Sequence, residues 1–238
     1  PKNIIKEIVD KSFIRLNNSS KNAYKILDFG CGTGRFYFEI ISRATKESDL
    51  PKIEIIENIY AADSDESSLV ILKFNLLYLL KNESINKIKN ILQNIICEDL
   101  ITPKDIFDLS KNSVLDKKFD LVVSNPPFLN LKTNNSTKFK NKDEYKSFVY
   151  KIKNLSYYEY SNEGVPNLYK LSIENMLKLL NKDGVLGLIC PLTLLGDKTS
   201  TKLRRYIVSA ELLLPDTLGD SLPSSDPVSG SGSGSTLL

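Results

Sequence analysis

The chain has 238 residues, of which 41% are apolar and 26% charged, so it can bury a full hydrophobic core and is expected to form one main domain. It contains no histidine, which excludes Ser-His-Asp hydrolysis, histidine-ligated metal sites and histidine general bases. Its three cysteines lie far apart and form no C-x-x-C pair, so we expect neither disulfides nor a metal site. The net charge of +3 says little about nucleic acid. No apolar run approaches the about 18 residues of a membrane span and no signal peptide opens the chain, so we expect a cytoplasmic protein without a membrane partner.

A strand, a glycine turn and a helix are predicted in succession near the N-terminus. Residues 25–29 are predicted to form a strand, and an apolar-periodic helix begins soon after it. Between them, residues 30–34 have the spacing G-x-G-x-G, not the G-x-G-x-x-G of dinucleotide sites that seat a pyrophosphate on the helix. With Asp28 at its start, this turn favours a ligand with a zwitterionic tail, such as S-adenosylmethionine.

The second and third predicted strands end in acidic residues. Residues 58–62 lead to Asp63, which could accept hydrogen bonds from both hydroxyls of a ribose. The alternative is that Asp63 is an N-terminal acid of the helix predicted over 69–80. Residues 94–97 lead to Asp99, which could accept a hydrogen bond from an adenine amino group, with Glu98 as the less favoured candidate.

The fourth predicted strand, residues 119–123, is followed by Asn125-Pro126-Pro127-Phe128. Two prolines forbid a helix and cannot donate to a sheet, so the chain leaves the sheet in a rigid turn. This turn presents an amide, a carbonyl and an aromatic ring, which can hold a planar amine by its hydrogens and stack on its ring. The alternative is an ordinary loop with a polar cap, because Asn-Pro is common in turns.

Four motifs together resemble a known family. D-F-G-C-G-T-G-R-F, A-A-D, E-D-L and N-P-P-F, in this order, resemble the S-adenosylmethionine-dependent adenine-N6 DNA methyltransferases of restriction–modification systems. Within that family the chain resembles the group whose glycine motif precedes the catalytic motif and whose target-recognition region follows the catalytic domain. The resemblance runs over residues 1–228, and residues 1–5 resemble the end of the family's N-terminal cofactor motif, so we expect a catalytic domain cut at both ends.

The resemblance implies a site without histidine or metal. The Asn125 oxygen and the Pro126 carbonyl would hold the two hydrogens of adenine N6, so catalysis would rest on positioning and electrostatics. Phe128 would stack on an adenine flipped out of the duplex. The catalytic residues implied are Asn125, Pro126, Pro127 and Phe128, and the cofactor residues are Asp28, Gly30, Gly32, Gly34, Phe36, Asp63 and Asp99.

Residues 129–153 carry seven lysines against two acids, with four aromatic residues interleaved. Such a loop, directly after the catalytic turn, could contact DNA phosphates. A solvated Lys/Asn-rich insertion is an equally good interpretation, since the whole chain is rich in both residues. The lysines are Lys132, Lys138, Lys140, Lys142, Lys146, Lys151 and Lys153.

The C-terminal part departs from the family. We predict a helix over 168–180, a turn over 181–184, a buried strand over 185–190, a helix over 202–208 and a strand over 210–214. Leu222 stands where the family supplies a second aromatic to the flipped base. A seventh strand is expected after residue 228, but residues 229–235 alternate Ser and Gly, which predicts a flexible tail of artificial character over 229–238.

We therefore expect an α/β Rossmann-like class I methyltransferase sandwich, with a mostly parallel sheet, helices on both faces and the last strand missing. Its open sheet edge would invite association, near residues 210–214 or beside the fifth strand. The expected function is adenine-N6 methylation of double-stranded DNA, with target recognition supplied by a domain absent from this chain. The alternatives are a ribosomal RNA guanine-N2 or protein glutamine methyltransferase, and an inactive methyltransferase-like binding module.

Overall fold

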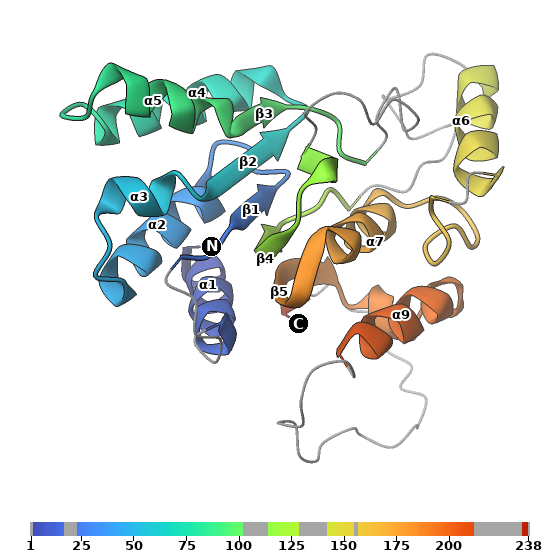
Figure 1. Ribbon diagram of the computed structural model, residues 1–238. Coiled ribbons are helices and arrows are strands. Elements are labelled where there is room, and N and C mark those ends of the chain that lie inside the picture. Colours follow the sequence, from blue (N-terminus) through green and yellow to red (C-terminus); the bar gives the residue numbers. More distant parts are fainter. Residues whose placement is uncertain are drawn as a thin grey trace.

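The computed structural model describes residues 2–16, 23–101, 114–128, 142–154, 157–211 and 235–237. Helices and strands alternate along most of the chain (Figure 1). The strands are β1 (Ile26–Phe29), β2 (Ile59–Asp63), β3 (Ile95–Cys97), β4 (Phe119–Ser124), β5 (Leu180–Pro191) and β6 (Ser235–Leu237). The helices are α1 (Lys2–Leu16), α2 (Arg35–Glu47), α3 (Lys52–Ile56), α4 (Glu66–Leu79), α5 (Ile85–Gln93), α6 (Lys142–Asn154), α7 (Leu168–Leu179), α8 (Thr193–Gly196) and α9 (Thr201–Glu211), with short 3-10 turns at Val114–Asp116 and Lys198–Ser200.

The strands form one sheet in the order β3-β2-β1-β4-β5-β6. The first five strands are parallel, and β6 runs antiparallel to β5. The chain moves from β1 outward to β3 and then returns to β4 on the other side of β1, so the order reverses between β1 and β4. At such a switch point the connections leave in opposite directions and open a crevice beyond the carboxyl ends of the strands.

Helices cover both faces of the sheet, as predicted. Successive strand residues point to opposite faces, so Ile26 and Leu121 pack in one core with α1 to α5, whereas Leu27 and Val122 pack in a second core with α7 and α9. These strands are buried on both faces, which is why their sequences are mostly apolar. The two carboxylates within them, Asp28 and Asp120, are buried as well.

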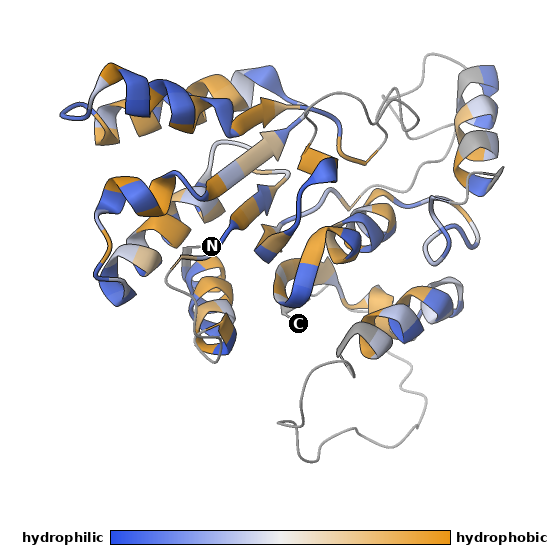
Figure 2. Cartoon of the chain, in the orientation of Figure 1, coloured by the Kyte–Doolittle hydropathy of each residue, from blue (hydrophilic) through white to orange (hydrophobic). Residues whose placement is uncertain are grey.

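Helix α1 packs unusually close to the sheet. It is amphipathic, with Ile8, Val9 and Phe13 buried against its neighbours (Figure 2). The close approach requires Gly187 in β5, because a Cβ there would lie 2.6 Å from Ser12 Oγ and 2.9 Å from Ile8 Cγ2. The N-terminal part of α1 is thereby brought toward the carboxyl ends of the strands.

The C-terminal predictions need three corrections. The predicted strand over 210–214 is wrong at its start, because Ala210 and Glu211 belong to α9, and residues 212–214 lie outside the described residues. The predicted turn over 181–184 lies within β5, where the register against β4 shifts and Asp183 has a φ of 67°. The sheet edge beside β5, expected to be open, is paired with β6, although Ser235–Leu237 was predicted to be part of a flexible tail.

The lysine-rich region was predicted as a loop, but its second half is helix α6. Lys142, Lys146 and Lys153 are exposed on this helix, and Lys146 lies 4.0 Å from Asp143. Lys132, Lys138 and Lys140, like Leu222, lie outside the described residues. In the described part of the chain, no helix is both long and apolar enough to cross a membrane.

Candidate functional site

The glycine turn connects β1 to α2 at the switch point of the sheet. Its first two residues are fixed by the neighbouring strand, because the backbone N–H groups of Gly30 and Cys31 donate to the Ala62 carbonyl at 2.9 and 3.1 Å. Gly32 and Gly34 have φ angles of 51° and 89°, in the left-handed region that favours glycine. The two positions differ in their surroundings. A Cβ at Gly32 would meet nothing within 4 Å, whereas one at Gly34 would lie 3.0 Å from the Leu72 side chain and 3.1 Å from Phe38.

Asp63 locks this turn. Its Oδ2 accepts a 2.7 Å hydrogen bond from the Gly32 N–H, and its Oδ1 accepts a 2.9 Å bond from the Asp65 N–H. The alternative role as a helix cap belongs instead to Asp65, which accepts hydrogen bonds from the Ser67 N–H and the Ser68 hydroxyl. Each Asp63 oxygen keeps a further lone pair, so a ribose contact stays a prediction.

Asp28 is fully buried beneath the turn. Its Oδ2 accepts a 2.9 Å hydrogen bond from the Tyr37 N–H in α2, and within the described part of the chain its Oδ1 has no hydrogen-bond partner. Burial raises the pKa of Asp28 to about 8, against the lowering effect of the Tyr37 hydrogen bond. Asp28 therefore joins β1 to α2, and a direct contact with a ligand stays a prediction.

Asp99 follows the edge strand β3 and is half-buried. The Glu98 N–H donates to the Asp63 carbonyl at 3.0 Å, so the ends of β2 and β3 are held together. The Asp99 Oδ1 accepts a 3.1 Å bond from the Ile101 N–H. Asn175 of α7 donates to the Leu100 carbonyl at 2.6 Å, which anchors this segment over the second core. The predicted hydrogen bond from an adenine amino group to Asp99 stays a prediction.

The Asn-Pro-Pro-Phe turn leaves β4 directly beside the glycine turn. Phe29 of β1 pairs with Ser124 of β4, and the Ser124 hydroxyl donates to the Phe29 carbonyl at 2.6 Å. The next residues, Gly30 and Asn125, therefore emerge from adjacent strands at the same level. The glycine turn and the Asn-Pro-Pro-Phe turn therefore lie side by side.

The side chains of this turn differ in exposure. Asn125 and Pro127 are exposed and Pro126 is buried. Phe128 is 48% exposed and packs edge-to-face against Tyr169 of α7, with ring centroids 6.4 Å apart and an interplanar angle of 77°. Tyr169 was not predicted as a site residue, because it lies in an ordinary apolar-periodic helix and has no motif around it.

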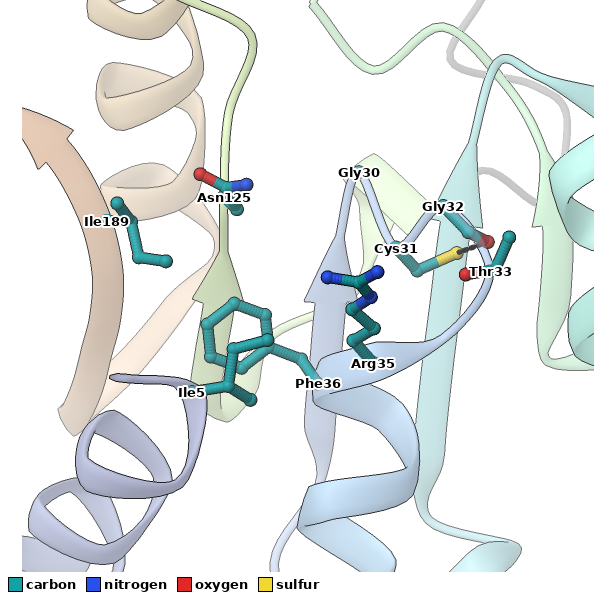
Figure 3. Close-up of a pocket in the computed structure, with 9 residues that line it drawn as sticks. All are labelled: Ile5, Gly30, Cys31, Gly32, Thr33, Arg35, Phe36, Asn125 and Ile189. Atoms are coloured by element: carbon teal, nitrogen blue, oxygen red, sulfur yellow. Dashed lines mark hydrogen bonds between the residues drawn. The ribbon is translucent and has the colours of Figure 1, made fainter. Parts of the chain in front are cut away.

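A cavity of about 430 Å³ joins the two turns (Figure 3). Its volume is within the range of about 300–1,000 Å³ that is usual for small-molecule sites. Its wall is formed by Ile5, Gly30, Cys31, Gly32, Thr33, Arg35, Phe36, Asn125 and Ile189.

Four of the predicted site residues line this cavity, and the others lie outside its wall. Those on the wall are Gly30, Gly32, Phe36 and Asn125. Those outside it are Asp28, Gly34, Asp63, Asp99, Pro126, Pro127 and Phe128. Sequence reasoning missed Ile5 and Ile189, because only the packing of α1 and β5 places them there. It also missed Arg35, although that residue follows the glycine motif directly.

Known proteins that are similar to this chain include a curated relative and two solved structures. The restriction enzyme and methyltransferase RM.Eco57I of Escherichia coli is 26% identical over 255 residues, which cover 87% of this chain and 24% of the relative. Among solved structures, the DrdV–DNA complex has a TM-score of 0.64 and 18% identity, covering 88% of this chain and 22% of that one. A class I S-adenosylmethionine-dependent methyltransferase of Listeria monocytogenes, described as putative, has a TM-score of 0.52 and 15% identity, covering 87% and 51% of the two chains.

The two structural likenesses show the fold, which is that of the class I methyltransferases. The chain spans only about a quarter of the length of RM.Eco57I. The model of the Eco57I restriction-modification methylase family matches residues 57–214, from the end of α3 through α9. Because this match takes in more than half of the sequence, the chain belongs to the Eco57I restriction-modification methylase family.

Proposed function

We propose that this chain is the catalytic core of a DNA adenine-N6 methyltransferase that uses S-adenosylmethionine. The observation that carries the proposal is the shared cavity, which brings Asn125 to the same wall as Gly30 and Gly32. The topology also supports it. The glycine turn follows β1 and the Asn-Pro-Pro-Phe turn follows β4, and these are the two strands that flank the switch point.

The residues present fit the cofactor. Gly30 and Gly32 leave open space where side chains would otherwise project, since a Cβ at either position would meet nothing within 4 Å. Phe36 and Ile5 add apolar wall to the same cavity. We infer that the methionine end lies along the glycine turn, and that the ribose and adenine extend toward Asp63 and Asp99. When bound, S-adenosylmethionine supplies an electrophilic methyl group on a sulfonium.

The protein's contribution would be to hold and activate an amine. The lone pair of adenine N6 is delocalised into the ring, so this nitrogen is a poor nucleophile. Two acceptors, the Asn125 side-chain oxygen and the Pro126 carbonyl, would bind its two hydrogens and make the lone pair more available. Their positions are preset by the rigid Pro-Pro turn, so little reorganisation is needed as charge develops.

Phe128 would hold the base by stacking, and Tyr169 supports it from behind through their edge-to-face contact. The target adenine would have to leave the duplex to reach Asn125. We propose that a target-recognition region outside residues 1–238 reads the DNA sequence, while exposed lysines of α6 contact phosphates. Membership of a restriction–modification family does not favour ribosomal RNA or protein glutamine as the substrate.

The test is transfer of a labelled methyl group under single-turnover conditions, at high protein and DNA concentration. Unmethylated DNA, ribosomal RNA and a glutamine peptide are offered in parallel, and we expect label on adenine N6 of DNA. Asn125→Ala should slow transfer on the order of 100–1000-fold, the usual effect of removing a preorganised polar group, and should keep cofactor affinity.

Asn75→Ala is the matched control, because Asn75 is exposed on α4 outside the cavity. It should leave the rate unchanged. Cofactor sites are tested separately by calorimetry, in which Asp63→Ala and Asp99→Ala should each weaken binding. Label on RNA or on the peptide instead of DNA, or full turnover by Asn125→Ala, would refute the proposed function.

A further inference from the structure

Arg35 has a special position in the cavity that joins the two turns. Among the described residues of the wall it is the only one with a charged side chain, and the others are apolar, polar and neutral, or glycine. Figure 3 shows its side chain rising from the start of α2, with the guanidinium below Gly30 in this view, on the wall of the cavity. A cation therefore faces the space in which the cofactor is proposed to bind.

The protein itself does not neutralise this cation. Within the described part of the chain, Arg35 makes no ion pair and no hydrogen bond through its side chain. Asp63 uses its two oxygens on backbone N–H groups, and Asp28 is buried beneath the turn. Arg43, two turns further along the same helix, is the contrasting case, since it is paired with Asp10 at 2.9 Å and with Glu47 at 2.5 Å.

Helix α2 gives no reason for a cation at this place either. Arg35 is its first residue, and a positive charge is unfavourable there because the helix dipole already places positive potential at the N-terminus. A guanidinium presents a planar fork of N–H donors that matches a carboxylate in a two-point contact. An anionic group of a ligand in the cavity would satisfy both the guanidinium and the adjacent backbone.

We propose that Arg35 binds the carboxylate of the amino-acid end of S-adenosylmethionine and so fixes the direction in which the cofactor lies in the cavity. This inference rests on the proposed function. The alternative ligand is a DNA phosphate, but Arg35 faces a cavity walled by Ile5, Phe36 and Ile189 and adjoins the glycine turn. A small ligand seated on that turn would lie beside Arg35, because both belong to the wall of the same cavity.

The experiment compares two ligands that differ only in the carboxylate. Calorimetry measures the binding of S-adenosylmethionine and of decarboxylated S-adenosylmethionine to the wild-type chain, Arg35→Ala and Arg35→Lys. Arg35→Ala should lose about 10- to 100-fold in affinity for S-adenosylmethionine, as expected for a charged hydrogen-bonded pair. It should change affinity for the decarboxylated compound less than about twofold. Arg35→Lys should recover part of the loss, since a lysine keeps the charge but not the fork.

Lys46→Ala is the matched control, because Lys46 is exposed in the last turn of the same helix. This substitution removes one positive charge at the end of α2 that is remote from the cavity. It should affect neither ligand. If Arg35→Ala lost the same affinity for both ligands, or none for either, the role of Arg35 would be wrong, whereas the proposed function would be unaffected. Lower DNA affinity with unchanged cofactor affinity would assign Arg35 to a phosphate instead. If the wild-type chain bound neither compound, the proposed use of the cofactor would itself be wrong.

Discussion

Alanine substitutions at Gly32 and Gly34 of the glycine turn should have different effects on stability and on ligand binding, although the two positions are only two residues apart. Gly34 has a φ of 89°, and a Cβ there would lie 3.0 Å from Leu72 and 3.1 Å from Phe38. Gly32 has a φ of 51°, and its Cβ would project into open space. Alanine at either position must adopt a left-handed backbone, but only alanine at 34 must also displace the packing between α2 and α4.

The magnitudes follow from these two terms. A left-handed backbone costs an alanine about 1–2 kcal/mol, partly offset by about 0.4–1 kcal/mol because alanine lowers the entropy of the unfolded chain. Gly32→Ala should therefore lower the free energy of unfolding by about 1 kcal/mol. Overpacking adds about 1–3 kcal/mol, so Gly34→Ala should lower it by about 2–4 kcal/mol.

Urea unfolding of both variants measures this difference directly, provided that the slope m is unchanged. Calorimetry with S-adenosylmethionine should show the opposite ranking at a temperature where both variants are folded. Gly32→Ala should lose more affinity, because its methyl group would occupy part of the cavity. Equal destabilisation of the two variants, or unchanged cofactor binding by Gly32→Ala, would refute the reasoning.

Three further predictions concern the environment of the site. Because the pKa of Asp28 is about 8 when folded and about 4 when unfolded, unfolding releases a proton between these values and stability should fall as pH rises from about 4 to 8, by up to about 1.4 kcal/mol per pH unit. Urea unfolding at several pH values should show this fall reduced in Asp28→Asn, and identical profiles for both proteins would contradict it. Gly187→Val should push α1 away from β5, which hydrogen exchange would detect as lost protection in α1, together with weaker cofactor binding through Ile5. Protection equal to wild type would show that α1 tolerates the larger residue. DNA binding by residues 1–238 should be non-specific, with a Kd of about 10⁻⁴–10⁻⁶ M that rises steeply with salt, and fluorescence anisotropy showing sequence-specific binding would contradict this.

The sequence by itself determined the central sheet and the location of the two turns. Residues 26–29 and 119–124 are buried on both faces, so their mostly apolar sequences identified them without reference to neighbours. Glycine and proline identified the turns for a similarly local reason, because they restrict or free the backbone whatever surrounds them. Since parallel strands end at one edge of a sheet, Gly30 and Asn125 could be predicted to lie together.

The tertiary structure decided which side chains surround those turns. Ile5 and Ile189 reach the cavity only because α1 packs across Gly187 and β5 pairs with β4. Tyr169 meets Phe128 only because α7 covers that face of the sheet. From the sequence, either Asp63 or one of its neighbours could cap α4. In the structure Asp65 caps the helix, and Asp63 accepts a hydrogen bond from the glycine turn instead. The limits of α9 and the pairing of β6 with β5 were likewise beyond prediction, because weak apolar patterns fit a helix or a strand until long-range contacts choose between them.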